Sequence, residues 1–327
     1  MTAPLAVLGF GGSLETLITL VLLNIVMAYG GYIVVAGGSF SLAFVAFIGL
    51  GAYTAAILNV DHGIGIIPAL AVAPVLAVLA ASVLAKPLAR LSGIYLALVS
   101  VAVISVFRVL LLNLDELTGG ALGKIGVTPR IGLPALALAA GVLATLFWLV
   151  HRSMIGRAMR LVRADRLAAS SLGIDVSTLQ YRLFLASAAV GAVGGVLRAY
   201  YFGFVVPNEY GFHLLVILLA MVILGGVGHW SGPIVGAAVW TLLPEWLRPL
   251  DVWREVATGL ILLAIIIALP QGVTGGLGDA TRRLRHRLKF HGADKRDAGN
   301  EREPAGVAGD SAVEARRVAV ASTEFGG

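Results

Sequence analysis

The sequence contains no complete phosphate-binding loop, although one pair of residues resembles its end. In the pattern G-x-x-x-x-G-K-[ST], backbone N–H groups hold phosphates and the last hydroxyl holds a metal ion. Gly123-Lys124 is the nearest match, but Ile125 follows it and Thr118 stands where the first glycine is required. No histidine and carboxylate grouping suits catalysis or metal binding, and cysteine is absent. We therefore expect no enzyme activity, metal or cofactor in this chain.

The segment from Ser153 to Arg182 has the pattern of a short capped helix that contacts another protein. Asp165 is placed to cap the start of this helix, and Gly173 to end it in a left-handed turn. The small side chains between them can enter a groove, and the surrounding arginines can steer the encounter. An ordinary basic loop on lipid headgroups is the alternative. The residues that we assign to the contact are Arg157, Arg160, Asp165, Ala168, Ala169 and Gly173.

The composition indicates that the segment from Ser153 to Arg182 connects helices that cross a lipid bilayer. Of the 327 residues, 58% are hydrophobic and 13% are charged, and the mean hydropathy is +0.93. A soluble domain requires more polar surface, whereas long apolar stretches suit helices across a hydrocarbon layer of roughly 30 Å. We predict an all-α, polytopic transmembrane bundle of about 8 to 10 spans.

Nine apolar stretches are the predicted spans, with ends that this pattern defines only to within several residues. Those at 40–59, 212–228 and 231–247 are rich in glycine and suit bent, discontinuous or re-entrant helices. The nine stretches are 14–35, 40–59, 64–84, 94–114, 133–150, 183–205, 212–228, 231–247 and 253–270.

The positive charges give the predicted spans an orientation. Thirteen lysines and arginines lie on one side of the nine-span arrangement and four on the other. The positive-inside rule therefore places the loop 151–182 and the C-terminus in the cytoplasm and the N-terminus outside. The first Lys or Arg is Lys86, so the N-terminus lacks the charged region of a secretory signal.

A change of composition after Gly278 predicts two parts. Residues 1–278 form the transmembrane domain with the cytoplasmic loop 151–182, and residues 279–327 form a basic and then disordered cytoplasmic tail. The formal charge is +6, but the basic run 282–289 directly follows an apolar span. We therefore expect it to meet anionic lipid headgroups of the bilayer, and we expect no nucleic acid partner.

The segment around Ala168 resembles the cytoplasmic coupling loop of the permeases of ATP-binding-cassette (ABC) importers. That loop has a glutamate, two alanines and a glycine four residues after the second alanine. Ala168, Ala169 and Gly173 match it, and Leu167 stands at the glutamate position. Over residues 20 to 278 the chain is similar to LivM-type permeases of branched-chain amino acid importers. The matching pieces are 23–25, 41–53, 91–98, 153–173, 224–228, 232–237 and 243–245.

The resemblance implies an inner-membrane permease of a bacterium that forms half of a translocation pathway for branched-chain or related small amino acids. It implies a second, homologous permease subunit, two ATPase subunits that use ATP and Mg²⁺, and an extracytoplasmic substrate-binding protein. The chain departs from the family pattern at Ser39, where glutamine is common, and at Ala43-Phe44, where Gly-His is common.

Two alternatives remain. A permease of the same superfamily could move urea, amides or a sugar. A stand-alone secondary transporter is the second alternative, and it requires ionisable residues at mid-membrane, which are scarce here.

Several polar, aromatic and glycine residues within the apolar stretches are candidates for the pathway or for packing. Arg198 and Arg108 lie inside apolar stretches, where they either extend outward or line an outer vestibule. The pathway candidates are Asn24, Ser41, Phe44, Phe47, Gly49, Gly51, Tyr53 and Arg108. Glycines at intervals of four residues predict close helix packing, and they are Gly191, Gly195, Gly228, Gly232 and Gly236.

Overall fold

The computed structural model describes residues 10–39, 41–88, 91, 93–129, 131–247, 249, 253–269 and 272–275. The predicted tail 279–327 and its basic run lie outside the described residues. The described part is almost entirely helical, which confirms the prediction of an all-α bundle.

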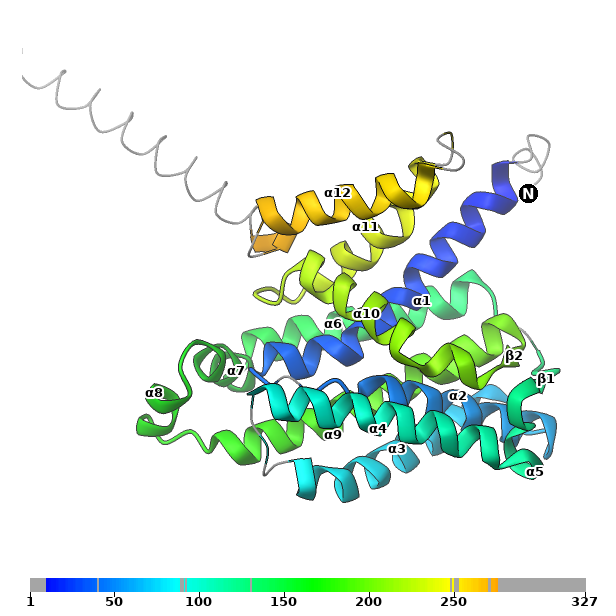
Figure 1. Cartoon of the computed structure of the whole chain (residues 1–327), viewed down its shortest axis with the longest axis horizontal. Helices are drawn as coiled ribbons and strands as arrows, with labels where there is room; N and C mark the ends of the chain where they lie inside the picture. Colours follow the sequence, from blue (N-terminus) through cyan, green and yellow to red (C-terminus); the bar gives the residue numbers. More distant parts are fainter. Residues whose placement is uncertain are drawn as a thin grey trace, which may run out of the picture. The chain divides into compact units, whose positions relative to one another are not determined.

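Each of the nine predicted spans contains one helix, and short elements connect them (Figure 1). The nine helices are α1 (Phe10–Ala36), α2 (Phe44–Val60), α3 (Ile66–Leu88), α4 (Gly93–Asn113), α6 (Leu133–Arg152), α9 (Val176–Phe202), α10 (Phe212–Gly225), α11 (Gly232–Trp246) and α12 (Arg254–Ala268). The short elements are α5 (Asp115–Thr118), η2 (Gly120–Leu122), β1 (Lys124–Ile125), α7 (Met154–Ala164), α8 (Arg166–Ser171), β2 (Phe204–Val205) and η3 (Pro207–Tyr210).

Among the described residues, five helices are long and apolar enough to cross a membrane: α1, α3, α4, α6 and α9. Helices α2 and α10, with 17 and 14 residues, fall short of that length. The three glycine-rich stretches thus form helices of 14 to 17 residues, and α12, with 15, is equally short.

The start of α9 differs from the predicted boundary at residue 183, which was wrong. The helix begins at Val176, because Asp175 caps it and accepts a hydrogen bond from the N–H of Thr178 at 3.0 Å. The same carboxylate accepts bonds from the hydroxyls of Ser177 and Thr178, and these bonds lower the pKa of Asp175 to about 2. A polar cap thus starts the helix one to two turns before its apolar face begins.

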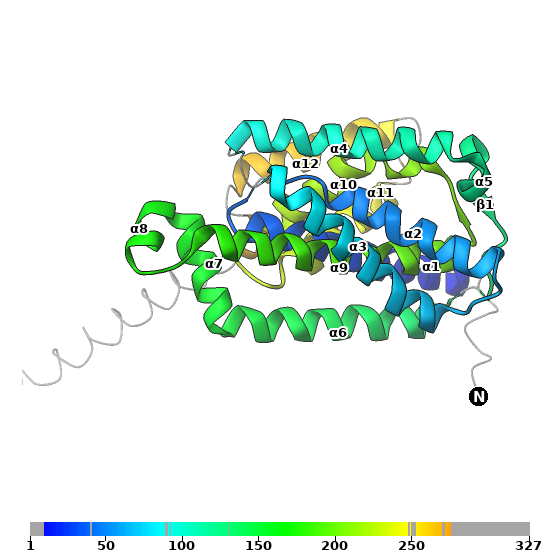
Figure 2. The same ribbon diagram turned by 90° about the horizontal axis from the view of Figure 1, so that it is seen from below.

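Helices α1 and α9 are the most buried of the five long helices, with α3, α4 and α6 more exposed around them (Figure 2). Helix α9 contacts α1, α2 and α3. At one end of the helices, β1 and β2 pair antiparallel, with Lys124 opposite Val205. Helices α7 and α8 lie at the other end (Figure 2).

Glycines allow the backbones of α2 and α9 to touch where they cross. A Cβ atom added to Gly195 would lie 1.9 Å from the carbonyl oxygen of Ile48, and one on Gly51 would lie 2.2 Å from that of Ala192. Gly191 lies one turn before Gly195, where an added Cβ would be 3.3 Å from the carbonyl oxygen of Phe44. Backbone atoms cannot move aside as side chains can, so this crossing requires glycine.

A second close crossing joins α10 and α11. A Cβ atom added to Gly236 would lie 1.8 Å from the carbonyl oxygen of Met221, and one on Gly232 would lie 2.0 Å from that of Gly226. Gly228 takes no part in this crossing, because it lies in the loop before α11 and is exposed. The interval of four residues grouped Gly228 with the other two, although it crosses the predicted break between the spans 212–228 and 231–247, and α11 begins only at Gly232.

Candidate functional site: an exposed short helix beside an arginine-rich helix

The start of α8 is fixed by the cap predicted from sequence. One carboxylate oxygen of Asp165 accepts hydrogen bonds from the N–H groups of Leu167 at 2.8 Å and Ala168 at 3.1 Å. The negative charge also lies at the positive end of the helix dipole. The capping prediction for Asp165 is confirmed.

The end of α8 is a Schellman motif. Gly173 has a φ of +81°, and a side chain at this position would be strained even though no other atom is near. Its N–H donates to the carbonyl of Ser170 at 3.0 Å, and the N–H of Ile174 donates to that of Ala169 at 3.2 Å. The predicted left-handed turn at Gly173 is confirmed.

Helix α8 presents large apolar side chains to its surroundings. Leu167 is 82% exposed and Leu172 is 69% exposed, and Ala168 between them is also exposed. Ala169, by contrast, is only 1% exposed and packs within the chain. The two alanines that sequence treats alike therefore differ: Ala169 seats α8, and Ala168 faces outward with the two leucines. We call Leu167, Ala168 and Leu172 the α8 surface.

Contacts to the neighbouring helices hold α7 and α8 in place. Arg166 donates a hydrogen bond of 2.8 Å to the carbonyl of Gly38, directly after α1. Ser153 caps α7 by accepting a bond from the N–H of Gly156 at 3.4 Å. A Cβ atom on Gly156 would lie 2.4 Å from the carbonyl oxygen of Val150, so glycine lets α7 turn tightly back against α6.

The arginines of α7 neutralise the negative end of α6. Arg157 donates to the carbonyl of Arg152 at 3.3 Å, and Arg160 donates to that of His151 at 3.0 Å. Cations at a helix C-terminus are favourable because the free carbonyls there carry partial negative charge. Both side chains remain exposed.

Of the pathway candidates, Ser41 and Phe47 line cavities. Ser41 lines a cavity of about 80 Å³ beside Gln180 and Phe184. Phe47 lines a larger apolar cavity of about 420 Å³ with residues of α2, α3 and α4, including Phe107. The rings of Phe47 and Phe184 meet edge to face, 5.5 Å apart, and each belongs to one of the two cavities.

The other candidates in α1 and α2 make packing contacts. Phe44 is buried against Gly31, and Gly49 faces Phe107 and Tyr210. Asn24 donates a hydrogen bond of 2.9 Å to the hydroxyl of Thr241 in α11.

A group of polar residues joins α2, α4 and α9 to η3. Arg108 donates two bonds to the side-chain oxygen of Asn208, at 2.6 and 3.1 Å. Arg198 pairs with Glu209 at 3.0 Å. The ring of Tyr53 packs edge to face on that of Tyr210. Burial raises the pKa of Tyr210 to about 12, so its hydroxyl stays protonated.

Sequence reasoning missed the partners that complete these contacts. Phe184 and Phe107 are far in sequence from the residues that they meet, and Glu209 reaches Arg198 across the turn that follows α9. Gly156 carried a detectable signal, because it lies three residues after a capping serine. Among the described residues, no cluster of three or more His, Asp or Glu side chains could hold a metal ion.

Comparison with known proteins shows which family the chain resembles. The family described as branched-chain amino acid transport system / permease component matches residues 13–270. The high-affinity branched-chain amino acid transport system permease protein LivM of Escherichia coli (strain K12) is 29% identical over 290 residues, which cover 78% of this chain and 68% of LivM. No solved structure matches the chain significantly.

Shorter matches involve other permeases of import systems. The autoinducer 2 import system permease protein LsrC of Klebsiella pneumoniae is 30% identical over 182 residues, covering 51% of this chain and 48% of LsrC. The permease protein LivH of Escherichia coli (strain K12) is 28% identical over 130 residues, covering 38% of this chain and 41% of LivH.

The family match extends from α1 to the end of α12 and includes α7 and α8. These proteins are transport permeases and not enzymes. The chain is therefore a multi-pass membrane permease that belongs to the family of branched-chain amino acid transport system permease components.

Proposed function

We propose that this chain forms half of a translocation pathway for branched-chain amino acids in the inner membrane of a bacterium. A second, homologous permease supplies the other half, and an extracytoplasmic binding protein delivers the substrate. The observation that carries the proposal is the match to LivM along most of both chains. The apolar cavity beside Phe47 suits only the aliphatic side chain of such a substrate, since its lining is almost wholly hydrocarbon and the charged ammonium and carboxylate groups require polar partners elsewhere.

We propose further that one of two separate ATPase subunits docks at the α8 surface and the other at the corresponding loop of the second permease, and that both use ATP and Mg²⁺ on behalf of the complex. Exposed leucines on a rigid, doubly capped protrusion can enter a partner's groove without loss of the protrusion's own structure. The arginines of α7 border this surface and provide electrostatic steering. Motion of the ATPase subunits would then reach α9, which contacts α8 and lies in the buried centre.

We place the loop 151–182 and the tail 279–327 in the cytoplasm and the N-terminus outside, with residues 1–278 as the transmembrane domain. The support is the distribution of charge, since the arginines of α7 and α8 gather at one end of the helices. The oppositely charged pair Lys124 and Asp61 lies at the β1 end.

The orientation predicts which side of the membrane reaches two exposed positions. The cysteine-free chain allows single cysteines to be placed at Ser170, next to the α8 surface, and at His62, in the turn after α2. We expect a membrane-impermeant maleimide to label His62→Cys in intact cells and Ser170→Cys only after the cells are opened. Labelling of Ser170→Cys in intact cells would reverse the proposed orientation.

The substrate is tested with the cognate binding protein. We expect calorimetric titration to show tight binding of leucine, isoleucine or valine and no binding of pentoses or urea. Binding of a sugar without any amino acid response would reassign the chain to a sugar-transporting branch. The shorter match to LsrC, an autoinducer 2 import permease, is the observation that favours considering a substrate other than a branched-chain amino acid.

A further inference from the structure

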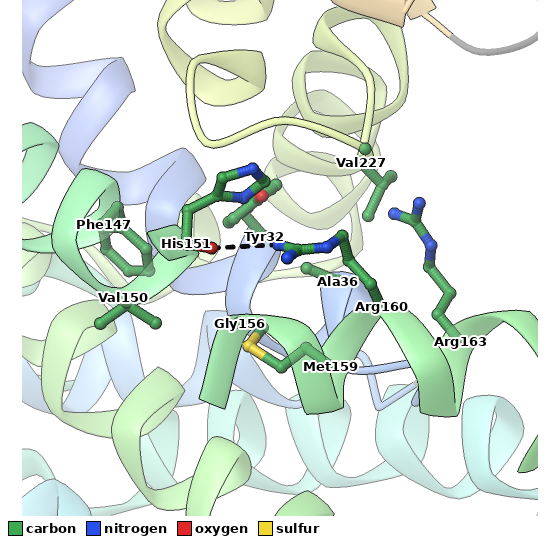
Figure 3. Close-up of a pocket in the computed structure, with 11 residues that line it drawn as sticks. Tyr32, Ala36, Phe147, Val150, His151, Gly156, Met159, Arg160, Arg163 and Val227 are labelled. Atoms are coloured by element: carbon green, nitrogen blue, oxygen red, sulfur yellow. Dashed lines mark hydrogen bonds between the residues drawn. The ribbon is translucent and has the colours of Figure 1, made fainter. Parts of the chain in front are cut away.

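A small pocket lies at the junction of α1, α6, α7 and the loop between α10 and α11 (Figure 3). Its base is apolar and includes Ala36 and Phe147, whereas its rim carries Arg160 and Arg163. Figure 3 shows Arg160 extending toward His151, with Arg163 on the other side of the pocket. The pocket shares no lining residue with the α8 surface or with the cavities beside Ser41 and Phe47.

The positive charge at this rim has no counter-charge within the described residues. The ion pairs among the described residues are Lys124 with Asp61 and Arg198 with Glu209, and none of these four residues lines the pocket. No carboxylate lines the pocket. Arg163 is exposed and donates no hydrogen bond to a described residue. Arg160 donates, among described residues, only to the carbonyl of His151, so two guanidinium groups without a carboxylate partner face one pocket and favour a bound anion.

The chemistry of the rim favours a phosphate group. Guanidinium groups hold phosphate oxygens through paired N–H donors, and Arg160 and Arg163 lie one helical turn apart. His151 lines the same pocket and supplies a further possible donor. The enclosed volume of about 20 Å³ admits one oxygen-sized group, so the rest of any ligand must lie outside the pocket.

The surroundings favour a lipid headgroup as the source of that phosphate. Helix α7 follows α6 directly at the end of a predicted span. Arg152 stacks on Trp148 just before the turn, 4.1 Å from the ring centre, and such pairs of tryptophan and arginine are typical of the headgroup level. Met154, Ile155 and Leu146 are exposed around the same turn and are suited to contact acyl chains.

We propose that Arg160, Arg163 and His151 bind the phosphate of an anionic phospholipid, which thereby joins α7 to the loop between α10 and α11. The bound lipid lies in the cytoplasmic leaflet in the orientation given above. The site is separate from the path of the transported substrate, and it shares Arg160 with the residues assigned to the ATPase contact. It adds a ligand that holds the arginine-rich helix beside α8.

The test compares two single substitutions on α7. Arg163→Gln removes one charge from the pocket without breaking a hydrogen bond to a described residue. Arg157→Gln removes the same charge from the same helix, but outside the pocket. Retention of phosphatidylglycerol and phosphatidylcholine by the purified full-length chain is measured by native mass spectrometry. The melting temperature is measured in nanodiscs that contain either phosphatidylcholine alone or a mixture with phosphatidylglycerol.

We expect the unmodified chain to retain phosphatidylglycerol preferentially and to melt at a higher temperature in its presence. Arg163→Gln should reduce that preference about fivefold, and Arg157→Gln by clearly less. Equal effects of both substitutions would show that general surface charge is responsible and would overturn the site. If inorganic phosphate raises the melting temperature in phosphatidylcholine discs and phosphatidylglycerol does not, the pocket binds a soluble anion. That result would contradict binding of a lipid.

Discussion

Replacing Leu167 by aspartate is expected to abolish ATP-driven uptake while the permease still inserts and folds. The resembling coupling loops carry a glutamate at this position and so meet a polar groove, whereas a groove that takes Leu167 must be apolar. Loss of a buried leucine contact costs about 1.5–3 kcal/mol, and a carboxylate in an apolar groove costs more. A combined loss of about 4 kcal/mol weakens binding of the ATPase subunits roughly a thousandfold. An acidic residue in the first turn of a helix is favourable, so α8 itself should remain intact.

The control for this substitution is Leu122→Asp. Leu122 is also 82% exposed, but it lies in η2, between α5 and β1, at the opposite end of the helices (Figure 2). Pull-down of the ATPase subunits should fail for Leu167→Asp and succeed for Leu122→Asp. If both variants bind the ATPase subunits normally, the α8 surface is not their docking site.

Gly195→Leu is expected to prevent the chain from folding. The first atom of the new side chain would meet the carbonyl oxygen of Ile48 at 1.9 Å and the amide nitrogen of Ala52 at 2.8 Å. Ordinary overpacking costs about 1–3 kcal/mol, and here two main chains must separate, so we expect a loss above that range. Since α2 and α9 form the buried centre, the damage should spread to the whole bundle.

Gly141→Leu provides the matched control, because Gly141 in α6 has no atom within 4 Å of an added Cβ. Fluorescence-detected size-exclusion chromatography should show a monodisperse peak for Gly141→Leu and little or none for Gly195→Leu. Equal yields and equal melting temperatures of the two variants would contradict the close crossing of α2 and α9.

Local features of this fold were predictable from sequence, because a few neighbouring residues determine them. Each of the nine apolar stretches contains a helix as predicted, and Asp165 and Gly173 predicted both ends of α8. The start of α9 was missed because a polar cap begins that helix before its apolar face. Gly228 was misplaced because its spacing continues a helix that starts only at Gly232.

Contacts between distant segments could not be predicted, because nothing local specifies the partner. The glycine pattern indicated that Gly195 packs closely, but not that Ile48 lies against it. Similarly, the sequence made Phe47 a pathway candidate but did not indicate that the ring of Phe184 packs against it. The difference between Ala168 and Ala169 arises in the same way, since only the path of the neighbouring helices decides which alanine is covered.

The most direct test of the account is uptake of labelled leucine into proteoliposomes that contain the complete complex. We expect uptake to require ATP inside the proteoliposomes, where it reaches the ATPase subunits, and the binding protein outside them. We also expect uptake to require an intact α8 surface on this chain, so that Leu167→Asp abolishes it. Uptake by this chain alone, driven by a proton or sodium gradient and unaffected by ATP, would identify a secondary transporter and contradict the account.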